Sequence, residues 1–272
     1  MILDGHIHLT EKEGEVDDFK KRLEKAGLGG GIVLSPAPAS FESRNHSLSP
    51  EERMEKVLTW TEDSSNLYAF FWVDPLDPGA REQVEMAEEM GADGIKVICN
   101  NFYPGDAKPM KIWKEVAAKK LPLLFHSGIS YAGTNSSKYH RPAEFEALFT
   151  IDGIKFCLAH ISWPWCDECL AVYGKYINVI KGRKNKDIEM YIDITRGTPP
   201  IYRKEALYKI YNVGYDIEDN VIFGTDNRAN NYDYERTLNM IEKDNEIYEE
   251  LGLESKVINK IYEDNLKRFV QN

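Results

Sequence analysis

The feature that most constrains this chain is an alternation of short β-like runs with helical patterns along nearly its whole length. Strands that alternate with helices favour βα units and a parallel sheet. Eight such units with no break in composition predict an α/β protein with a single domain, residues 1–272, folded as a (β/α)8 TIM barrel; the alternative is a doubly wound open sheet. The eight runs are rich in Val, Ile, Phe, Leu or Tyr: Ile2–His8, Gly31–Ser35, Tyr68–Val73, Gly94–Ile98, Leu121–His126, Lys155–His160, Met190–Thr195 and Val221–Gly224.

Between these runs, apolar residues recur at helical spacing. Ser49 and Glu52 form a capping-box pattern that predicts a further helix inside the long connection Pro36–Asn66. This connection and Ile129–Arg141 both leave the C-terminal ends of strands, so we expect them to border the mouth of the barrel as substrate walls or lids. The charged tail Ile241–Val270 is expected to be an additional C-terminal helical segment that packs outside the barrel. The helices expected between the runs are Asp17–Ala26, Arg81–Met90, Pro109–Lys120, Ala143–Phe149 and Asp167–Tyr176.

Composition and charge narrow the partners. The chain has 42% hydrophobic and 29% charged residues and a net charge of −11, so nucleic acid and anionic membrane surfaces are poor partners. No apolar run approaches the ~20 residues of a membrane helix, and no signal peptide is readable, so we expect a cytoplasmic protein. Cys166 and Cys169 form a C-x-x-C pattern, but a structural zinc site needs four ligands, so all four cysteines are interpreted as reduced.

Histidines mark the predicted strand ends. The chain has six histidines, and four of them, His6, His8, His126 and His160, stand at the C-terminal ends of runs, while Asp226 follows the eighth run. Side chains at i and i+2 of a strand share a face, so His6 and His8 are expected to point together into the barrel. The first and eighth strands are neighbours in a closed barrel, which brings Asp226 close to them.

Three imidazoles and one carboxylate suit a borderline metal ion. We therefore predict one divalent metal ion bound by His6, His8, His126 and Asp226. Zn2+ is the expected ion, and Mn2+ and Fe2+ are the alternatives. A catalytic metal site also keeps a position open for water.

Five motifs stand at the predicted strand ends and in the C-terminal tail. They are Asp4-Gly5-His6-Ile7-His8, Leu121-Pro122-Leu123-Leu124-Phe125-His126-Ser127-Gly128, Ala159-His160 with Trp163-Pro164-Trp165, Phe223-Gly224-Thr225-Asp226, and Ile261-Tyr262-Glu263-Asp264-Asn265-Leu266. Together they resemble the amidohydrolase superfamily, within it the amidohydrolase-related (amidohydrolase 2) subfamily that contains aminocarboxymuconate semialdehyde decarboxylase and related hydrolases. The likeness extends from residue 4 to about residue 268.

The resemblance implies roles for these residues. His6, His8, His126 and Asp226 would hold one metal, usually zinc, which lowers the pKa of its water to about 7. Asp226 would orient that water and take its proton. His160 would stay off the metal, or bind it only loosely, and would polarise the substrate or shuttle a proton.

Lys96 has two interpretations. It lies in Gly94-Ile95-Lys96-Val97, where some members of the superfamily carbamylate a lysine that bridges two metals. In the decarboxylase-related subfamily a lysine often occupies this place without bridging, and a buried lysine paired with a carboxylate such as Asp193 is the structural alternative.

The residues expected to contact the substrate lie just after strand ends and in the loops at the mouth of the barrel. Arg196 and Arg228 are candidates to bind a carboxylate, although surface ion pairs explain them as well. An aromatic wall is expected from Trp163 and Trp165, and Asn100 and Tyr131 are weaker candidates.

Two classes of function remain open. We expect a metal-dependent hydrolase of a small molecule, in which activated water attacks an amide, lactone or ester bond. Non-oxidative decarboxylation of a small unsaturated or aromatic acid is the enzymatic alternative, and a non-catalytic metal- or ligand-binding barrel is the other. The partner is expected to be a small molecule, with a carboxylate in some cases, and relatives of this kind are often homodimers.

Overall fold

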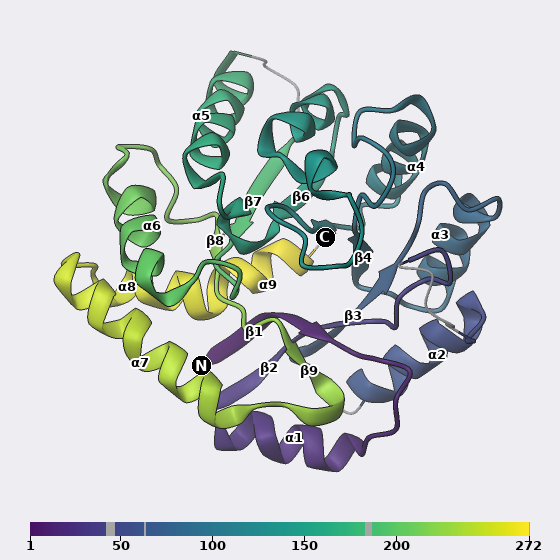
Figure 1. Cartoon of the computed structure of the whole chain (residues 1–272), viewed down its shortest axis with the longest axis horizontal. Coiled ribbons are helices and arrows are strands. Elements are labelled where there is room, and N and C mark those ends of the chain that lie inside the picture. Colours follow the sequence, from purple (N-terminus) through teal and green to yellow (C-terminus); the bar gives the residue numbers. More distant parts are fainter. Residues whose placement is uncertain (42–46, 63, 183–186, 272) are drawn as a thin grey trace.

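The computed structural model describes residues 1–41, 47–62, 64–182 and 187–271. In this part of the chain the strands form one curled, fully parallel sheet in the order β8-β7-β6-β5-β4-β3-β2-β1-β9. Helices lie around the outside of the sheet (Figure 1). This is an α/β fold consistent with the expected TIM barrel. The strands are β1 (Ile2–His8), β2 (Leu28–Leu34), β3 (Leu67–Trp72), β4 (Gly94–Val97), β5 (Leu123–Phe125), β6 (Lys155–Leu158), β7 (Glu189–Asp193), β8 (Val221–Ile222) and β9 (Asn227–Arg228).

The expected helices are present, with small shifts in their ends. Ala143–Phe149, expected to be helical, lies in the 3-10 helix Pro142–Thr150 rather than in an α-helix. The helix predicted around Ser49 is confirmed with both capping-box hydrogen bonds, from Glu52 N to Ser49 Oγ at 3.2 Å and from Ser49 N to Glu52 Oε2 at 2.7 Å. The first five α-helices are α1 (Val16–Lys25), α2 (Pro50–Thr61), α3 (Ala80–Glu89), α4 (Ala107–Ala118) and α5 (Cys166–Gly182). The 3-10 helices are η1 (Ser137–His140), η2 (Pro142–Thr150), η3 (Ala159–Ser162) and η4 (Ala229–Asn231).

One helix was not predicted. α6 spans Pro200–Asn212 and buries Ala206, Leu207 and Ile210 against the rest of the fold. Its start, Pro199-Pro200, is typical of a loop, and no side chain caps it. The apolar face is also diluted by tyrosines, so the periodicity was too weak to predict a helix.

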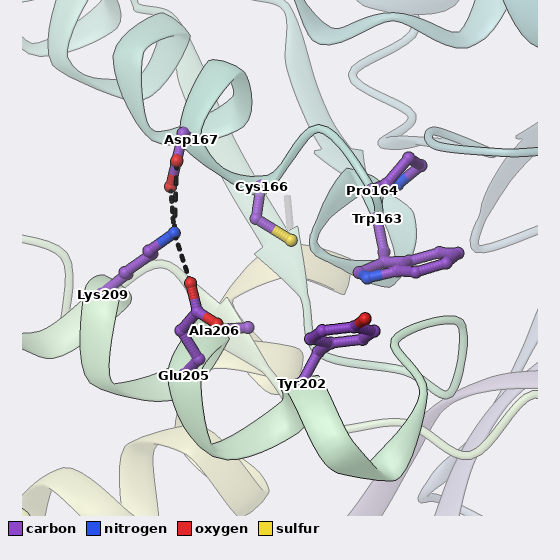
Figure 2. Close-up of a pocket in the computed structure, with 8 residues that line it drawn as sticks. All are labelled: Trp163, Pro164, Cys166, Asp167, Tyr202, Glu205, Ala206 and Lys209. Atoms are coloured by element: carbon purple, nitrogen blue, oxygen red, sulfur yellow. Dashed lines mark hydrogen bonds and ion pairs between the residues drawn. The ribbon is translucent and has the colours of Figure 1, made fainter.

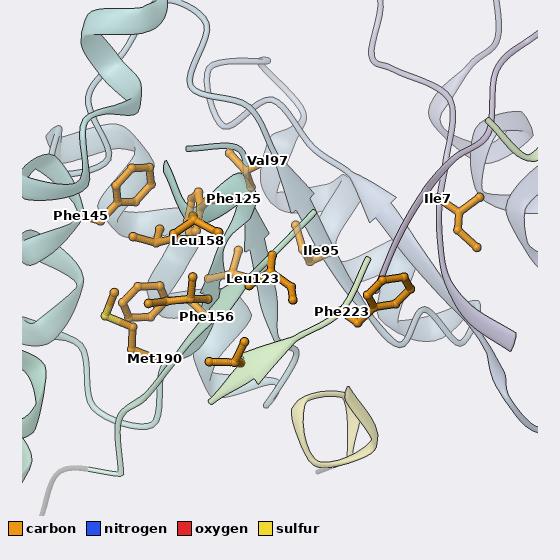
Figure 3. Packing of buried hydrophobic residues seen from close by; sticks show 14 of the residues in the cluster. Ile7, Ile95, Val97, Leu123, Phe125, Phe145, Phe156, Leu158, Met190 and Phe223 are labelled. Atoms are coloured by element: carbon orange, nitrogen blue, oxygen red, sulfur yellow. The ribbon is translucent and has the colours of Figure 1, made fainter. Parts of the chain in front are cut away.

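Strand residues alternate between two apolar clusters, one on each face of the sheet. The outer cluster, between sheet and helices, includes Ile7 of β1, Ile95 of β4 and Leu158 of β6 (Figure 3). The inner cluster includes Leu124 and Cys157, the strand neighbours of outward-facing residues. This two-residue period identifies which side chains point into the curled sheet.

Only the first two residues of the predicted eighth strand, Val221–Gly224, form a strand, β8, and the short strand β9 lies beyond the predicted end. β8 pairs with β7 and β9 pairs with β1. Between them, Asp226 has a left-handed backbone with φ of 57°, which interrupts the strand. The connecting residues still bond to β1, with Gly5 N donating to Phe223 O at 2.8 Å and Asp226 N donating to His6 O at 3.0 Å.

The C-terminal segment is helical, as predicted, but its position outside the barrel was wrong for its last helix. Leu266 and Phe269 are fully buried in the inner cluster with Leu3 of β1. Nearby, Asn265 Nδ2 donates to Val221 O at 2.8 Å and so holds the start of β8. Leu266 and Phe269 therefore cover the apolar inner face at the N-terminal ends of the strands. The segment consists of α7 (Tyr234–Glu250), α8 (Ser255–Asn259), the π-helix η5 (Lys260–Asp264) and α9 (Asn265–Val270).

Two further expectations concern the whole chain. No helix in the described ranges has the length and apolar character needed to cross a membrane. Cys99, Cys157, Cys166 and Cys169 are buried free thiols, as interpreted from the sequence. His46, in the long connection after β2, lies outside the described residues.

Candidate metal centre

His6 and His8 point into the curled sheet from the end of β1. They alternate with Ile7, which packs in the outer cluster, so both imidazoles face inward as predicted. Their ring centroids are 5.1 Å apart. The His6 side chain is fully buried, whereas the His8 side chain is 25% exposed and faces the mouth.

The other histidines continue this pair into a row of five rings. The His160 centroid lies 5.1 Å from that of His6, the His126 centroid 5.0 Å from that of His160, and the His140 centroid 4.7 Å from that of His126. Because the rings come from β1, from the residues that follow β5 and β6, and from η1, the fold gathers imidazoles that are far apart in the sequence. His140, the last residue of η1 in the connection after β5, is fully buried in this row.

The direction of His160 depends on an unusual backbone. Leu158 of β6 faces the outer cluster and Ala159 the inner cluster, so regular alternation would turn His160 outward. Instead His160, Ile161 and Ser162 all have left-handed φ angles, of 64°, 50° and 54°. This turn, costly for non-glycine residues, brings the His160 ring over the inner face.

Asp226, between β8 and β9, adds a carboxylate to the group beside β1. Its Oδ1 lies 3.2 Å from His8 Nε2 and 3.9 Å from His6 Nε2. Its left-handed backbone and the hydrogen bond from its N–H to the His6 carbonyl fix where the carboxylate can reach. Burial acts to raise the pKa of Asp226, but the His8 hydrogen bond and the nearby imidazoles outweigh it, so the net direction is downward.

Asp193, at the end of β7, orients two of the histidines. Its Oδ2 accepts from His6 Nδ1 at 2.9 Å, and its Oδ1 accepts from the backbone N–H of His160 at 2.7 Å. Thr195 also bonds this carboxylate and contacts His160 Nδ1 at 2.8 Å. Burial acts to raise the pKa of Asp193, but the bond from His6 and the imidazole charges outweigh it and hold the pKa at about 2.

Sequence reasoning considered Asp193 only as a partner for Lys96. The signal that could have identified it is the one used for the histidines, a polar residue at the C-terminal end of a barrel strand. With Nδ1 of His6 and Nδ1 of His160 both engaged, the Nε2 atoms are left to face the site.

Lys96 lies at the centre of the site. Its fully buried side chain places Nζ 3.2 Å from His6 Nε2, and no ion pair within 4.0 Å joins it to Asp193 in the part of the chain that the structure describes. Burial lowers the pKa of Lys96 to about 8, with Asp193 and Asp226 acting in the opposite direction. Burial thus moves the Lys96 amine toward its neutral form, while the two carboxylates favour the charged form.

The buried imidazoles favour the neutral form. Burial, followed by the charge of Lys96, lowers the pKa of His6 to about 3. Burial also lowers the pKa of His126 and of His160, and it lowers that of His140 to about 4. Neutral imidazole is the form that binds a metal ion.

These donors fit a divalent metal. One ligand atom each from His6, His160 and Asp226 can lie within 4.8 Å of one another. His8 lies at one side of this group, and His126 at the other, with a buried Nε2 that has no hydrogen-bond partner among the described residues. The structure thus brings His160, expected off the metal, into the tightest group, while the predicted ligands His8 and His126 flank it.

A third carboxylate, Asp4, joins the strands that form the wall behind the site. Its oxygens accept from Thr225 N at 2.8 Å, Thr225 Oγ1 at 2.5 Å, Tyr232 Oη at 2.8 Å and His6 N at 3.1 Å. Burial raises the pKa of Asp4 to about 6, although each of these bonds acts to lower it. Asp4 therefore ties β1 to the residues that carry Asp226.

The predicted aromatic wall lies to the side of the imidazole row. Trp163 stacks on Tyr202, with centroids 6.1 Å apart, and lines a cavity of about 330 Å³ between α5 and α6 (Figure 2). Trp165 lies under the guanidinium of Arg141, 4.9 Å from its ring centre. Both contacts explain the tryptophans through packing of the loop after β6.

The remaining predicted contacts differ in exposure. Arg196 and Arg228 are exposed after β7 and in β9. Asn100 accepts from Thr134 Oγ1 at 3.1 Å, a contact between two mouth loops. Tyr131 is 77% exposed and points to solvent.

The sequence matches a known protein family over nearly its whole length. Residues 4–270 match the model of the family described as amidohydrolase. The chain belongs to the amidohydrolase family. This amidohydrolase is therefore an enzyme of a metal-dependent family, as the sequence predicted. No curated protein matches it in sequence.

Solved structures resemble this amidohydrolase in fold. They include 2,6-dihydroxybenzoate decarboxylase from Rhizobium, 13% identical with a TM-score of 0.59, where the likeness covers 99% of this chain and 97% of that one. Amidohydrolase 2 from Bifidobacterium longum subsp. infantis is 14% identical with a TM-score of 0.56, covering 99% and 98%. Dihydroorotase from Campylobacter jejuni is 14% identical with a TM-score of 0.58, covering 100% and 83%. At these identities the likeness shows the fold alone.

Proposed function

We propose that this amidohydrolase is a metal-dependent hydrolase that cleaves an amide, lactone or ester bond of a small molecule. The observation that carries the proposal is the position of Asp226. Its Oδ1 lies 3.2 Å from His8 Nε2, and it belongs to the 4.8 Å donor group with His6 and His160. A carboxylate in this place can bind a metal and also accept a proton from an attacking water.

The proposed metal is zinc, with manganese and iron as alternatives, held by His6, Asp226 and histidines of the row. A divalent metal would supply a Lewis acid that polarises a carbonyl and lowers the pKa of water to about 7. One ion is proposed rather than two. A second ion would need Lys96 to be carbamylated, as in the two-metal members of the superfamily, and its Nζ lies 3.2 Å from His6 Nε2.

The chain's own residues have distinct tasks in this reaction. Asp226 accepts the proton of the attacking water and returns it to the leaving group. His160, held through Nδ1 by Thr195, keeps its other ring nitrogen in the donor group with His6 and Asp226. Asp193 keeps His6 and His160 in place through its two oxygens.

The fold proposal is that the sheet closes as a (β/α)8 barrel. In this view β8 and β9 are two halves of one eighth strand, interrupted at Asp226. The bonds from Gly5 N to Phe223 O and from Asp226 N to His6 O support this view, because they continue the pairing with β1 between the two halves. Closure would place every candidate ligand at one rim.

Non-oxidative decarboxylation is the second candidate. It is favoured by Arg236, whose Nη2 donates to Thr225 O at 3.2 Å and whose guanidinium has no ion pair within 4.0 Å among the described residues, since a decarboxylase must bind the carboxylate of its substrate. The same metal site could then stabilise the charge that develops as CO2 leaves.

The test is a comparison of Asp226→Asn with Asp152→Asn, an exposed aspartate in a turn. Metal content of each purified protein is measured by elemental mass spectrometry, and turnover is measured on panels of lactones, amides and esters and, for CO2 release, of carboxylic acids. We expect about one metal ion per chain. We also expect Asp226→Asn to keep most of it while losing about 10²-fold or more in turnover, because a general base is removed.

The Asp152→Asn control should match the unaltered protein. Full hydrolytic activity in Asp226→Asn would contradict the proposed role. CO2 release without hydrolysis would select the second candidate instead.

A further inference from the structure

His126, which follows β5, lacks the partner that His6 and His160 each have for one ring nitrogen. His6 Nδ1 contacts Asp193 Oδ2 at 2.9 Å. His160 Nδ1 contacts Thr195 Oγ1 at 2.8 Å. The buried Nε2 of His126, in contrast, has no hydrogen-bond partner in the described part of the chain. Because a histidine that binds a metal through one nitrogen almost always hydrogen-bonds through the other, the metal centre still needs a group that orients His126.

His140 is the side chain placed to supply this group. Its ring centroid lies 4.7 Å from that of His126, and the two ring planes meet at 78°. Two imidazoles joined by a linear N–H···N hydrogen bond of about 2.9 Å have centroids roughly 5 Å apart. The observed contact is close to this spacing, so a small rotation of either ring would complete the bond.

The backbone holds His140 beside His126. The carbonyl of His140 accepts from Gly128 N at 3.0 Å and from Ser127 Oγ at 3.1 Å. Ser127 and Gly128 are the two residues that follow His126 in the chain. The long connection after β5 therefore returns to the strand end from which it leaves, and its last turn, η1, places His140 at a fixed position against the His126 ring.

The ring of His140 has free hydrogen-bonding capacity of the kind required. The residue is fully buried, and neither Nδ1 nor Nε2 has a hydrogen-bond partner among the described residues, which is rare for buried polar atoms. Burial lowers the pKa of both His126 and His140, so each neutral ring carries one N–H donor and one acceptor nitrogen. The backbone of Cys99, just after β4, opposes the effect of burial on the His140 pKa, so it lies within reach of this ring.

We propose that His140 is a positioning residue for His126, joined to it by a hydrogen bond from His126 Nε2–H to one ring nitrogen of His140. His126 then keeps Nδ1 for the metal, whereas His6 and His160, which are engaged through Nδ1, face the site with Nε2. The other ring nitrogen of His140 carries its proton and donates toward the Cys99 carbonyl. This inference rests on the proposed function for the presence of a metal at His126.

The test measures the tautomer of His126 and the zinc affinity of the full chain. With isotope-labelled histidine, long-range proton–nitrogen NMR spectra show which nitrogen of each ring carries the proton, first without metal and then with zinc. The His126 signals are assigned from their loss in His126→Asn. Zinc affinity is measured by competition with a chromogenic chelator for the unaltered protein, His140→Phe, His140→Gln and the control Tyr139→Phe, which alters the preceding residue of η1. Thermal unfolding without metal separates a loss of zinc affinity from a loss of folding.

We expect the proton of His126 on Nε2 both without metal and with zinc. His140→Phe should bind zinc about 10-fold to 100-fold more weakly, because the group that orients a ligand is removed, and both tautomers of His126 should then appear in the metal-free protein. His140→Gln should lose less zinc affinity than His140→Phe, since its amide oxygen can still accept the hydrogen bond. Tyr139→Phe should bind zinc like the unaltered protein.

A proton on Nδ1 of His126 in the zinc-loaded, unaltered protein would overturn the proposal, because Nε2 would then be the ligand. Equal zinc affinity in His140→Phe and the unaltered protein would overturn it as well. The two proposals can fail separately. If His140 has no such role, metal content and the Asp226→Asn result stay as expected. If the hydrolase proposal fails, the His126 tautomer in the metal-free protein and its change in His140→Phe remain.

Discussion

Removing the carboxylate of Asp244 tests how α6 and α7 are joined. In the structure Asp244 is fully buried and receives two hydrogen bonds of 2.6 Å from Arg203, whose side chain is only 9% exposed. Arg203 also donates to Ile194 O at 2.8 Å, directly after Asp193. Asp244→Ala leaves a buried guanidinium without its counter-ion. The expected cost is about 3–5 kcal/mol, much more than that of an exposed ion pair.

This cost has a measurable size in thermal unfolding. For a protein of this length each kcal/mol lowers the Tm by roughly 2–4 °C, so Asp244→Ala should lower it by about 6–20 °C. Circular dichroism and urea unfolding report the change. Lys204→Ala is the matched control, because Lys204 pairs with Glu250 across the same two helices but is 55% exposed. It should leave the Tm nearly unchanged.

The double variant Arg203→Met/Asp244→Leu separates the effect of the buried charges on stability from the effect of the volume that the two side chains fill. It should recover much of the lost stability, since apolar residues of similar volume remove both buried charges. A Tm drop of under about 2 °C in Asp244→Ala, or a double variant as unstable as the single one, would refute the reasoning.

Two further predictions concern the wall of the site. Gly224→Ala should destabilise the fold by about 1–3 kcal/mol, because an added Cβ would lie 2.4 Å from Thr195 Cγ2; Gly133→Ala, with open space around it, is the control, and equal urea midpoints for the two would contradict the prediction. Because burial raises the pKa of Asp4 from 3.8 to about 6, the folded protein holds a proton that the unfolded chain releases between these values. The contribution of Asp4 to the free energy of unfolding should therefore increase as the pH falls from about 7 to 5 and be lost as the pH rises through 6. Asp4→Asn should remove this pH dependence, measured by urea unfolding at several pH values. Identical pH profiles for the variant and the unaltered protein would disprove the prediction.

The sequence predicted the fold well wherever a local pattern determines it. β1 has the predicted bounds, Ile2–His8, because its apolar residues and the His6-x-His8 alternation agree on one strand period. The capping box at Ser49 and Glu52 was likewise readable, since all its groups lie within four consecutive residues. α6 was missed because its face is defined by the neighbours it packs against rather than by its own periodicity.

The candidate site was predictable in membership more than in geometry. The strand-end rule found His6, His8, His126, His160 and Asp226. It could not show that His160 would join the tightest donor group, because left-handed backbone angles after β6 reverse the direction that alternation implies.

Residues that act through tertiary contacts were harder still. Arg236 lies at the start of α7, and nothing in its local sequence indicates that its Nη2 reaches Thr225 O at 3.2 Å. The placement of Leu266 and Phe269 against the inner cluster was missed for the same reason, since a charged amphipathic tail has the same pattern whether it covers the end or the side of a sheet.

The left-handed residues at His160 and Asp226 have a consequence for attempts to make this enzyme more heat-tolerant. Glycine would relax the backbone at either position but would delete the side chain that gives the position its purpose. Laboratory selection for thermal tolerance should therefore accumulate substitutions in the outer helices and around α9, where no such conflict exists, and should leave the rim unchanged for as long as activity is selected alongside.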